Sequence, residues 1–190
     1  MSHMLESCGY LTEINLSNFN AKNVTNMSYM FHSCIRLKKI DLSNLENSKL
    51  NDISFMFKNC KELENIDFSE FKTNRVQNME GLFEKCKSLK TLDLSSFNTQ
   101  NVNNMEKMFS YCENLKILDL SNFKTINVIK MSYMFENCSS LEYLDISNFN
   151  TINAKETREI FINCNKLLTN KKVVCKDKRL SSQFSDCLII

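Results

Sequence analysis

The amino-acid sequence predicts an α/β solenoid, in which a short strand and a helix alternate along a stack of similar coils. A cysteine recurs every 26 residues without insertion or deletion, at Cys8, Cys34, Cys60, Cys86, Cys112, Cys138 and Cys164. A fixed period of this length is typical of solenoids, whose coils contact only their neighbours. Within each coil the apolar pattern changes from alternation to steps of three and four residues, which indicates a strand followed by a helix.

The strand is expected in the first half of each coil, where apolar residues alternate with polar ones. Positions are counted from each cysteine as position 0. Leucine occupies position +3, and position +6 holds Ile14, Ile40, Ile66, Leu92, Leu118 and Leu144. Position +8 holds Leu16, Leu42, Phe68, Leu94, Leu120 and Ile146. A period of two over a short run bounded by polar residues predicts a half-buried strand.

The helix is expected in the second half of each coil. In the coil that begins at Cys86, the apolar residues are Val102, Met105, Met108 and Phe109, at positions +16, +19, +22 and +23. Steps of three and four residues that close on the next cysteine predict one apolar stripe of a helix of about three turns. The expected N-caps at position +13 are Thr73, Thr99, Thr125 and Thr151. At this spacing the methionines are interpreted as core packing, in preference to metal or haem ligands.

The seven in-phase cysteines are interpreted as a column of reduced, buried side chains, because equivalent positions of a solenoid lie above one another. Disulfide pairing within the column is the alternative. Cys175 and Cys187 lie outside the phase, and they could pair with each other in an oxidising compartment.

Composition and phase together set the domain organisation. Residues 1–3 resemble a cloning scar, residues 4–168 form the solenoid with six full repeats and partial ends, and residues 169–190 form a C-terminal cap. The cap is expected to carry a helix over residues 179–190. The first repeat begins at mid-coil and should expose an apolar end. The net charge of +2 gives no strong field toward nucleic acid, and no apolar run is long enough for a membrane helix.

The repeat resembles the BspA-like class of leucine-rich repeats over residues 4–168. Residues 89–99 read Leu-Lys-Thr-Leu-Asp-Leu-Ser-Ser-Phe-Asn-Thr, and residues 102–112 supply the Val-x-x-Met-x-x-Met-Phe-x-x-Cys half. The resemblance implies a curved solenoid with a parallel sheet on its concave face and helices on its convex face. It also implies a bacterial or protist protein that is exposed at the cell surface or secreted and that adheres to host proteins or other cells.

The candidate ligand-binding residues belong to the concave face of that expected fold. Position +5 varies among coils and provides Lys39, Asn65, Thr91, Ile117 and Tyr143. Position +7 provides a ladder of carboxylates, Asp41, Asp67, Asp93, Asp119 and Asp145, each followed two residues later by serine. Neighbouring carboxylates about 4.8 Å apart repel by roughly 1 kcal/mol in water. The ladder is therefore either structural, bonded to the serine hydroxyls or the backbone, or an acidic strip that binds cations or a repetitive ligand.

Catalysis has no support in the sequence. His32 and Cys34 are neighbours, but Cys34 belongs to the buried column, and no phosphate loop, Cys-x-x-Cys or histidine-based metal motif occurs. We expect no cofactor and no metal. The predicted function is a non-enzymatic protein–protein interaction or adhesion module, whose partner is a protein such as a host extracellular protein. The alternatives are a structural spacer that self-associates through its first repeat, and a cation-binding acidic strip.

Overall fold

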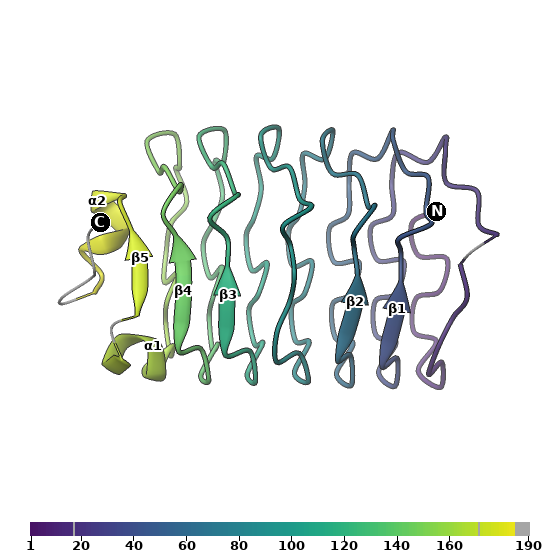
Figure 1. Cartoon of the computed structure of the whole chain (residues 1–190), viewed down its shortest axis with the longest axis horizontal. Coiled ribbons are helices and arrows are strands. Elements are labelled where there is room, and N and C mark those ends of the chain that lie inside the picture. Colours follow the sequence, from purple (N-terminus) through teal and green to yellow (C-terminus); the bar gives the residue numbers. More distant parts are fainter. Residues whose placement is uncertain (17, 171, 185–190) are drawn as a thin grey trace.

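The structure is a row of coils stacked side by side along one axis (Figure 1). It is a computed structural model that describes residues 1–16, 18–170 and 172–184. The strands are β1 (Lys39–Asp41), β2 (Asn65–Asp67), β3 (Ile117–Asp119), β4 (Tyr143–Ile146) and β5 (Val173–Cys175). The helices are α1 (Asn165–Asn170) and α2 (Lys178–Ser181). The predicted solenoid with parallel strands is therefore confirmed.

The strands form two parallel sheets, ordered β1-β2 and β3-β4-β5. Paired strands are in the register of the repeat, so that Ile40 lies opposite Ile66 and Leu118 opposite Leu144. Between β2 and β3, the equivalent residues 91–93 form no strand, and the sheet is interrupted. Leu92 is only partly buried at this interruption, although its counterpart Leu118 is fully buried.

The predicted convex-face helices are not formed, and this part of the prediction is wrong. The second half of each coil is a ribbon of tight turns with two left-handed residues four positions apart. In the Cys86 coil these are Lys107, with φ of 56°, and Tyr111, with φ of 61°. Cys112 N–H donates to the Phe109 carbonyl at 3.1 Å, which closes a three-residue turn where a helix would have a four-residue one.

The remaining backbone donors of the ribbon point to the next coil. Lys107 N–H donates to the Ser132 carbonyl at 3.0 Å, and Phe109 N–H donates to the Met134 carbonyl at 2.9 Å. Alternate N–H groups thus bond within the coil and between coils. The ribbons before the last one repeat this arrangement, so there the backbone groups that a helix would satisfy along its own axis are satisfied across the stack.

The threonines at position +13 are not N-caps, because no helix follows them. Thr99 is buried, and its hydroxyl donates to the Lys124 carbonyl at 3.1 Å and accepts from the Lys124 N–H at 2.7 Å. Thr73 bonds in the same way to Asn98. Thr125 repeats this pair of bonds with Asn150, so each of these three threonines joins its coil to the next one through both backbone groups of a single residue, whereas the Thr151 hydroxyl bonds the Asp177 carboxylate.

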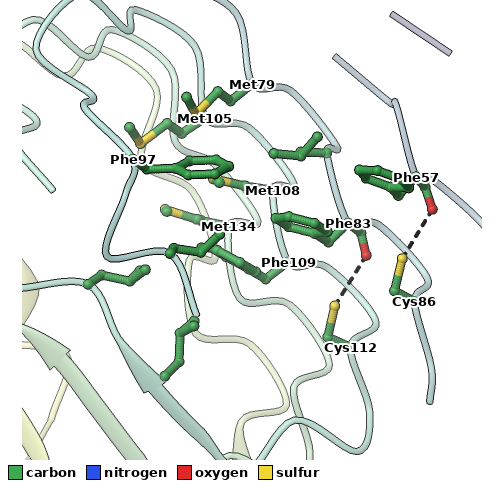
Figure 2. Close-up of a cluster of buried hydrophobic side chains, with 14 of the residues drawn as sticks. Phe57, Met79, Phe83, Cys86, Phe97, Met105, Met108, Phe109, Cys112 and Met134 are labelled. Carbon is green, nitrogen blue, oxygen red and sulfur yellow. Dashed lines mark hydrogen bonds between the residues drawn. The ribbon is translucent and has the colours of Figure 1, made fainter. Parts of the chain in front are cut away.

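Columns of equivalent side chains fill the core (Figure 2). The phenylalanines at position +23, from Phe31 to Phe161, stack with ring centroids 5.5 to 6.0 Å apart. Cys34 to Cys164 of the cysteine column are fully buried free thiols. The Cys112 thiol donates to the Phe83 carbonyl at 3.2 Å, and its neighbours repeat this bond. Burial raises the pKa of Cys112 to about 12, so the thiol stays protonated.

The described part of the C-terminal segment continues the stack. β5 pairs with β4 in parallel, with Val173 opposite Leu144. Asp177 caps α2 by accepting from Arg179 and Leu180 N–H, and it also accepts from Thr151 N–H at 2.7 Å. The helix predicted for residues 179–190 is formed only as the short α2 within its described half, and residues 185–190, with Cys187, lie outside the described residues. The division into scar, solenoid and cap stays a prediction, as does the Cys175–Cys187 pairing. In the described ranges, no helix is long and apolar enough to cross a membrane.

Candidate functional site

The strand face consists of the side chains at positions +5, +7 and +9, which point away from the core. In β1, β2 and β3 the central residue is buried and both flanking residues are exposed. The parallel register places equivalent side chains side by side, so that Lys39 lies opposite Asn65 and Ile117 opposite Tyr143. The fifth predicted residue, Thr91, is exposed at the interruption between β2 and β3.

The aspartates of the strand face hold the turn that ends each strand. One carboxylate oxygen of Asp41 accepts from the Ser43 N–H at 2.8 Å and from its hydroxyl at 2.6 Å. The same backbone bond to the serine two residues later measures 2.9 Å for Asp67, Asp93, Asp119 and Asp145. This is an Asx-turn, in which the side chain replaces a backbone acceptor.

These hydrogen bonds offset the repulsion along the aspartate ladder. The Ser43 hydroxyl and N–H groups lower the pKa of Asp41, and the Ser95 groups lower the pKa of Asp93. Each aspartate uses Oδ1 to hold its turn. This structural requirement explains why Asp is repeated at position +7. Asp41 lies opposite Asp67, and Asp119 opposite Asp145, so the strip of carboxylates predicted from the sequence is continuous within each sheet.

An apolar pair interrupts the polar strand face. Ile117 is 55% exposed, and the half-buried Tyr143 lies beside it on the neighbouring strand. The preceding residue Lys116 is exposed, and Glu142 pairs with Lys166 at 2.9 Å. Apolar side chains surrounded by charged ones have the composition of the centre of a protein–protein interface.

The interruption of the sheet hollows the strand face, and sequence reasoning missed it. A hollow of about 520 Å³ lies over Asn65, Asp67, Asp93 and Ser95. A second hollow, of about 490 Å³, is lined by several residues that include Asn65, Lys90 and Thr91. The residues of the Cys86 coil match the repeat more closely than any others, so the sequence carries no signal of the break.

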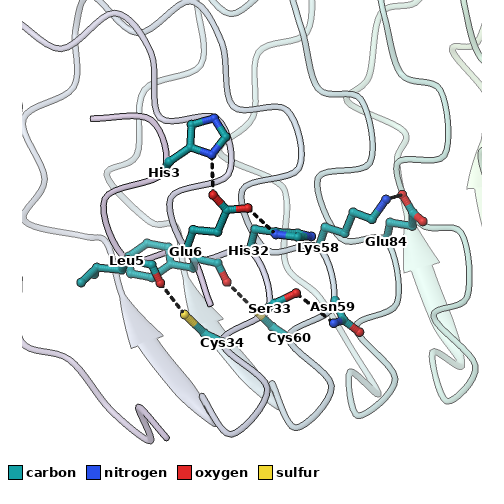
Figure 3. A network of polar contacts seen from close by, with 11 residues as sticks. His3, Leu5, Glu6, His32, Ser33, Cys34, Lys58, Asn59, Cys60 and Glu84 are labelled. Atoms are coloured by element: carbon teal, nitrogen blue, oxygen red, sulfur yellow. Dashed lines mark hydrogen bonds and ion pairs between the residues drawn. The ribbon is translucent and has the colours of Figure 1, made fainter. Parts of the chain in front are cut away.

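The turn face is the outer surface of the ribbons of turns that form the second half of each coil. His32 of this face and the buried Cys34, two residues apart, have different partners (Figure 3). His32 Nδ1 lies 2.9 Å from Glu6 Oε1, and Glu6 Oε2 lies 2.6 Å from His3 Nδ1. The Cys34 thiol donates to the Leu5 carbonyl at 3.1 Å, and burial raises its pKa to about 11. A protonated, hydrogen-bonded thiol is a poor nucleophile, so this neighbourhood is not built as a Cys–His pair.

An ion pair between a half-buried lysine and a buried glutamate lies near these residues on the turn face. Lys58 Nζ lies 3.0 Å from Oε2 of Glu84, whose side chain is 8% exposed (Figure 3). Nowhere in residues 1–16, 18–170 and 172–184 do three or more His, Cys, Asp or Glu side chains gather in a way that could hold a metal ion.

Comparisons with known proteins agree with this geometry. The family described as "Mycoplasma protein of unknown function, DUF285" matches residues 1–92 and 79–187. No curated protein matches the chain. A leucine-rich cell surface protein from Faecalibacterium prausnitzii is similar at 24% identity, with a TM-score of 0.51 over 76% of this chain. A leucine-rich repeat protein from Bacteroides ovatus is similar at 16% identity, with a TM-score of 0.41 over 92% of this chain.

The chain spans 34% of the length of the Faecalibacterium protein and 58% of that of the Bacteroides protein. The first likeness shows the fold. Together with the family match, it confirms the predicted leucine-rich repeat of the BspA-like class.

Proposed function

We propose that this chain, which belongs to the DUF285 family of Mycoplasma proteins, is a non-enzymatic module that binds another protein through its strand face. The observation that carries the proposal is the exposed pair of Ile117 and Tyr143 on β3 and β4. Ile117 is 55% exposed on β3, the edge strand of its sheet, and a partner that covered it would gain the free energy of removing its apolar surface from water.

The rest of the strand face supplies specificity in this proposal. Lys39, Asn65 and Thr91 continue the row of position +5 away from the apolar pair, and the aspartate strip runs parallel to it. The strand pairing of Lys39 with Asn65 holds the backbone of these two residues, so little of its conformational entropy is lost on binding. We take the strand face as the concave face of the solenoid and the module as part of a cell-surface or secreted adhesion protein. The name of the Faecalibacterium neighbour, a cell surface protein, supports the cell-surface setting.

The test is capture of host extracellular proteins on the immobilised chain, followed by titration of each captured protein after purification. We expect Ile117→Glu/Tyr143→Glu to weaken binding at least tenfold. The control is Ile152→Glu, which places one glutamate at a residue that is 78% exposed outside the strand face. Equal affinity of the double variant and the parent for every captured protein would refute this site.

A cation-binding strip is the second proposal for the same face. The observation that favours it is the pairing of Asp119 with Asp145 in register, with only Oδ1 of Asp119 used in the Asx-turn. Calorimetric titration with Ca²⁺ would show binding heat in the parent that decreases in Asp93→Asn/Asp119→Asn. Absence of heat in the parent, or unchanged heat in the variant, excludes the strip.

Self-association through the first coil is the third proposal. Leu11, Ile14 and Phe19 are only partly buried, whereas Leu115, at the position of Leu11 in a central coil, is fully buried. A second copy that covered these side chains would extend the stack. Light scattering over a hundredfold range of concentration would then show a rising mass, and a constant monomer mass would rule this out.

A further inference from the structure

The last full coil departs from the repeat where its ribbon of turns begins. Position +19 holds a fully buried Met or Ile in the earlier coils, as in Met105 and Met131, but holds the half-buried Thr157 here. Position +16 holds Ala154 in place of Val128 of the preceding coil. Thr157 lines a hollow of about 600 Å³ on the turn face, remote from the strand face, and the buried Ala154 lies three residues before it.

Basic and hydroxyl side chains line this hollow. They are Lys155, Thr157 and Arg158 of the last coil, Ser132 and Tyr133 of the preceding one, and Arg179 of α2. Ser132 Oγ accepts from the Arg158 N–H at 3.0 Å, so its own hydroxyl proton is available to a ligand. Thr157 places a hydroxyl where the repeat would place an apolar side chain.

The position of Arg179 is fixed by the cap. Nη1 of its guanidinium donates to the Ala154 carbonyl at 2.9 Å, and Asp177 Oδ1 accepts from the Arg179 backbone N–H. Asp177 is itself held by Thr151. A guanidinium has five N–H donors, so this one bond leaves others for a ligand.

The hollow is lined by more basic than acidic side chains. Its two carboxylates each lie near a lysine outside it, with Glu106 at 3.7 Å from Lys107 and Glu156 at 3.5 Å from Lys130. Among the ion pairs of the described residues, none involves Lys155, Arg158 or Arg179. The three cationic side chains of the hollow therefore form no ion pair with its two carboxylates.

We propose that this hollow binds a small oxyanion, a single carboxylate or phosphate group, held by Arg158 and Arg179. Planar guanidinium groups donate paired hydrogen bonds to such oxygens, and Ser132 and Thr157 add hydroxyl donors. Glu106 and Glu156 would repel a polyanion, which limits the ligand to one such group.

The test titrates inorganic phosphate and, separately, acetate into the parent protein at constant ionic strength, with backbone amide NMR shifts as the readout. Saturable shifts that cluster at Ser132, Thr157 and Arg158 with either probe are expected, and the probe that binds tighter identifies the ligand class. Absence of saturation with both probes overturns the proposal.

Two variants separate binding from folding. Thr157→Met restores the residue of the repeat and refills the hollow, so anion affinity should fall at least tenfold while the urea midpoint stays equal or rises. Arg158→Ala removes only an exposed side chain and should also weaken binding at least tenfold. Arg75→Ala, at an exposed arginine elsewhere in the stack, should leave affinity unchanged. Parent-like affinity in both Thr157→Met and Arg158→Ala, or equal loss in Arg75→Ala, overturns the site.

Discussion

The left-handed residues of the turn ribbon allow a mutational test. The stability difference between a glycine and an alanine variant has one sign if the segment is a turn and the opposite sign if it is a helix. Lys107 lies in the second half of a central coil with φ of 56°. We compare Lys107→Gly with Lys107→Ala. Both variants lose the same side-chain contacts, the 3.7 Å approach to Glu106 and the cation–π contact with Tyr133 at 5.7 Å, so the difference between them reports the backbone alone.

The magnitude follows from the conformational cost. A left-handed backbone costs an L-residue such as alanine about 1–2 kcal/mol, and glycine avoids this cost. Glycine loses about 0.5–1 kcal/mol more than alanine when its flexible unfolded chain is ordered. The glycine variant should therefore be more stable than the alanine variant by about 0.75 kcal/mol, the midpoint of a range of about 0–1.5 kcal/mol. In a helix the order would reverse, because glycine is about 1 kcal/mol less favourable than alanine there.

The assay is urea unfolding of both variants, with the free energy of unfolding obtained by linear extrapolation. The control pair is Lys130→Gly and Lys130→Ala, at a residue of the next ribbon that is not left-handed, where alanine should be the more stable. An alanine variant at Lys107 more stable than its glycine counterpart would refute the turn ribbon.

Three further predictions concern the core. Thr99→Val leaves both backbone groups of Lys124 without their side-chain partner and should cost about 1–3 kcal/mol in urea unfolding; a loss below about 0.5 kcal/mol would contradict the clamp. Phe109→Ala breaks the ring stack and should cost about 3–5 kcal/mol, measured in the same way. Because burial raises the pKa of Cys112 to about 12 and an unfolded thiol titrates near about 8.5, stability is full below the lower value and falls as pH rises toward the higher. The urea midpoint should thus decrease from about pH 8 to pH 10, and less so in Cys112→Ala.

The ribbon shows why apolar periodicity alone misled the prediction. Its left-handed residues recur every four positions, as do the apolar pairs Met105 with Phe109 and Met108 with Cys112. Over eight residues a period of four cannot be distinguished from the 3.6 of a helix. The deciding quantity is the direction of the backbone N–H groups, which depends on the presence of a neighbouring coil.

The candidate site also has a part that the sequence predicted and a part that it did not. The row of position +5 and the aspartate ladder could be placed from the sequence, because strand alternation and a constant repeat length determine which side chains share a face. The Asx-turn that uses Asp93 was one of two readings, and the structure supplies the bond to Ser95 N–H. The interruption at Leu92 and the hollow at Thr157 arise from how coils pack on one another, and local sequence does not encode that distance.

The solenoid, its 26-residue step, the parallel strand pairing and the buried columns of Cys, Met and Phe could all be derived from the amino-acid sequence. These follow from periodicity, because equivalent residues of identical coils must lie above one another. The packing of coil on coil was needed to see that the backbone returns as hydrogen-bonded turns, that Thr99 joins two coils, and that the sheet opens between β2 and β3. Those features depend on hydrogen bonds between residues about 25 positions apart, which form once neighbouring coils are in place.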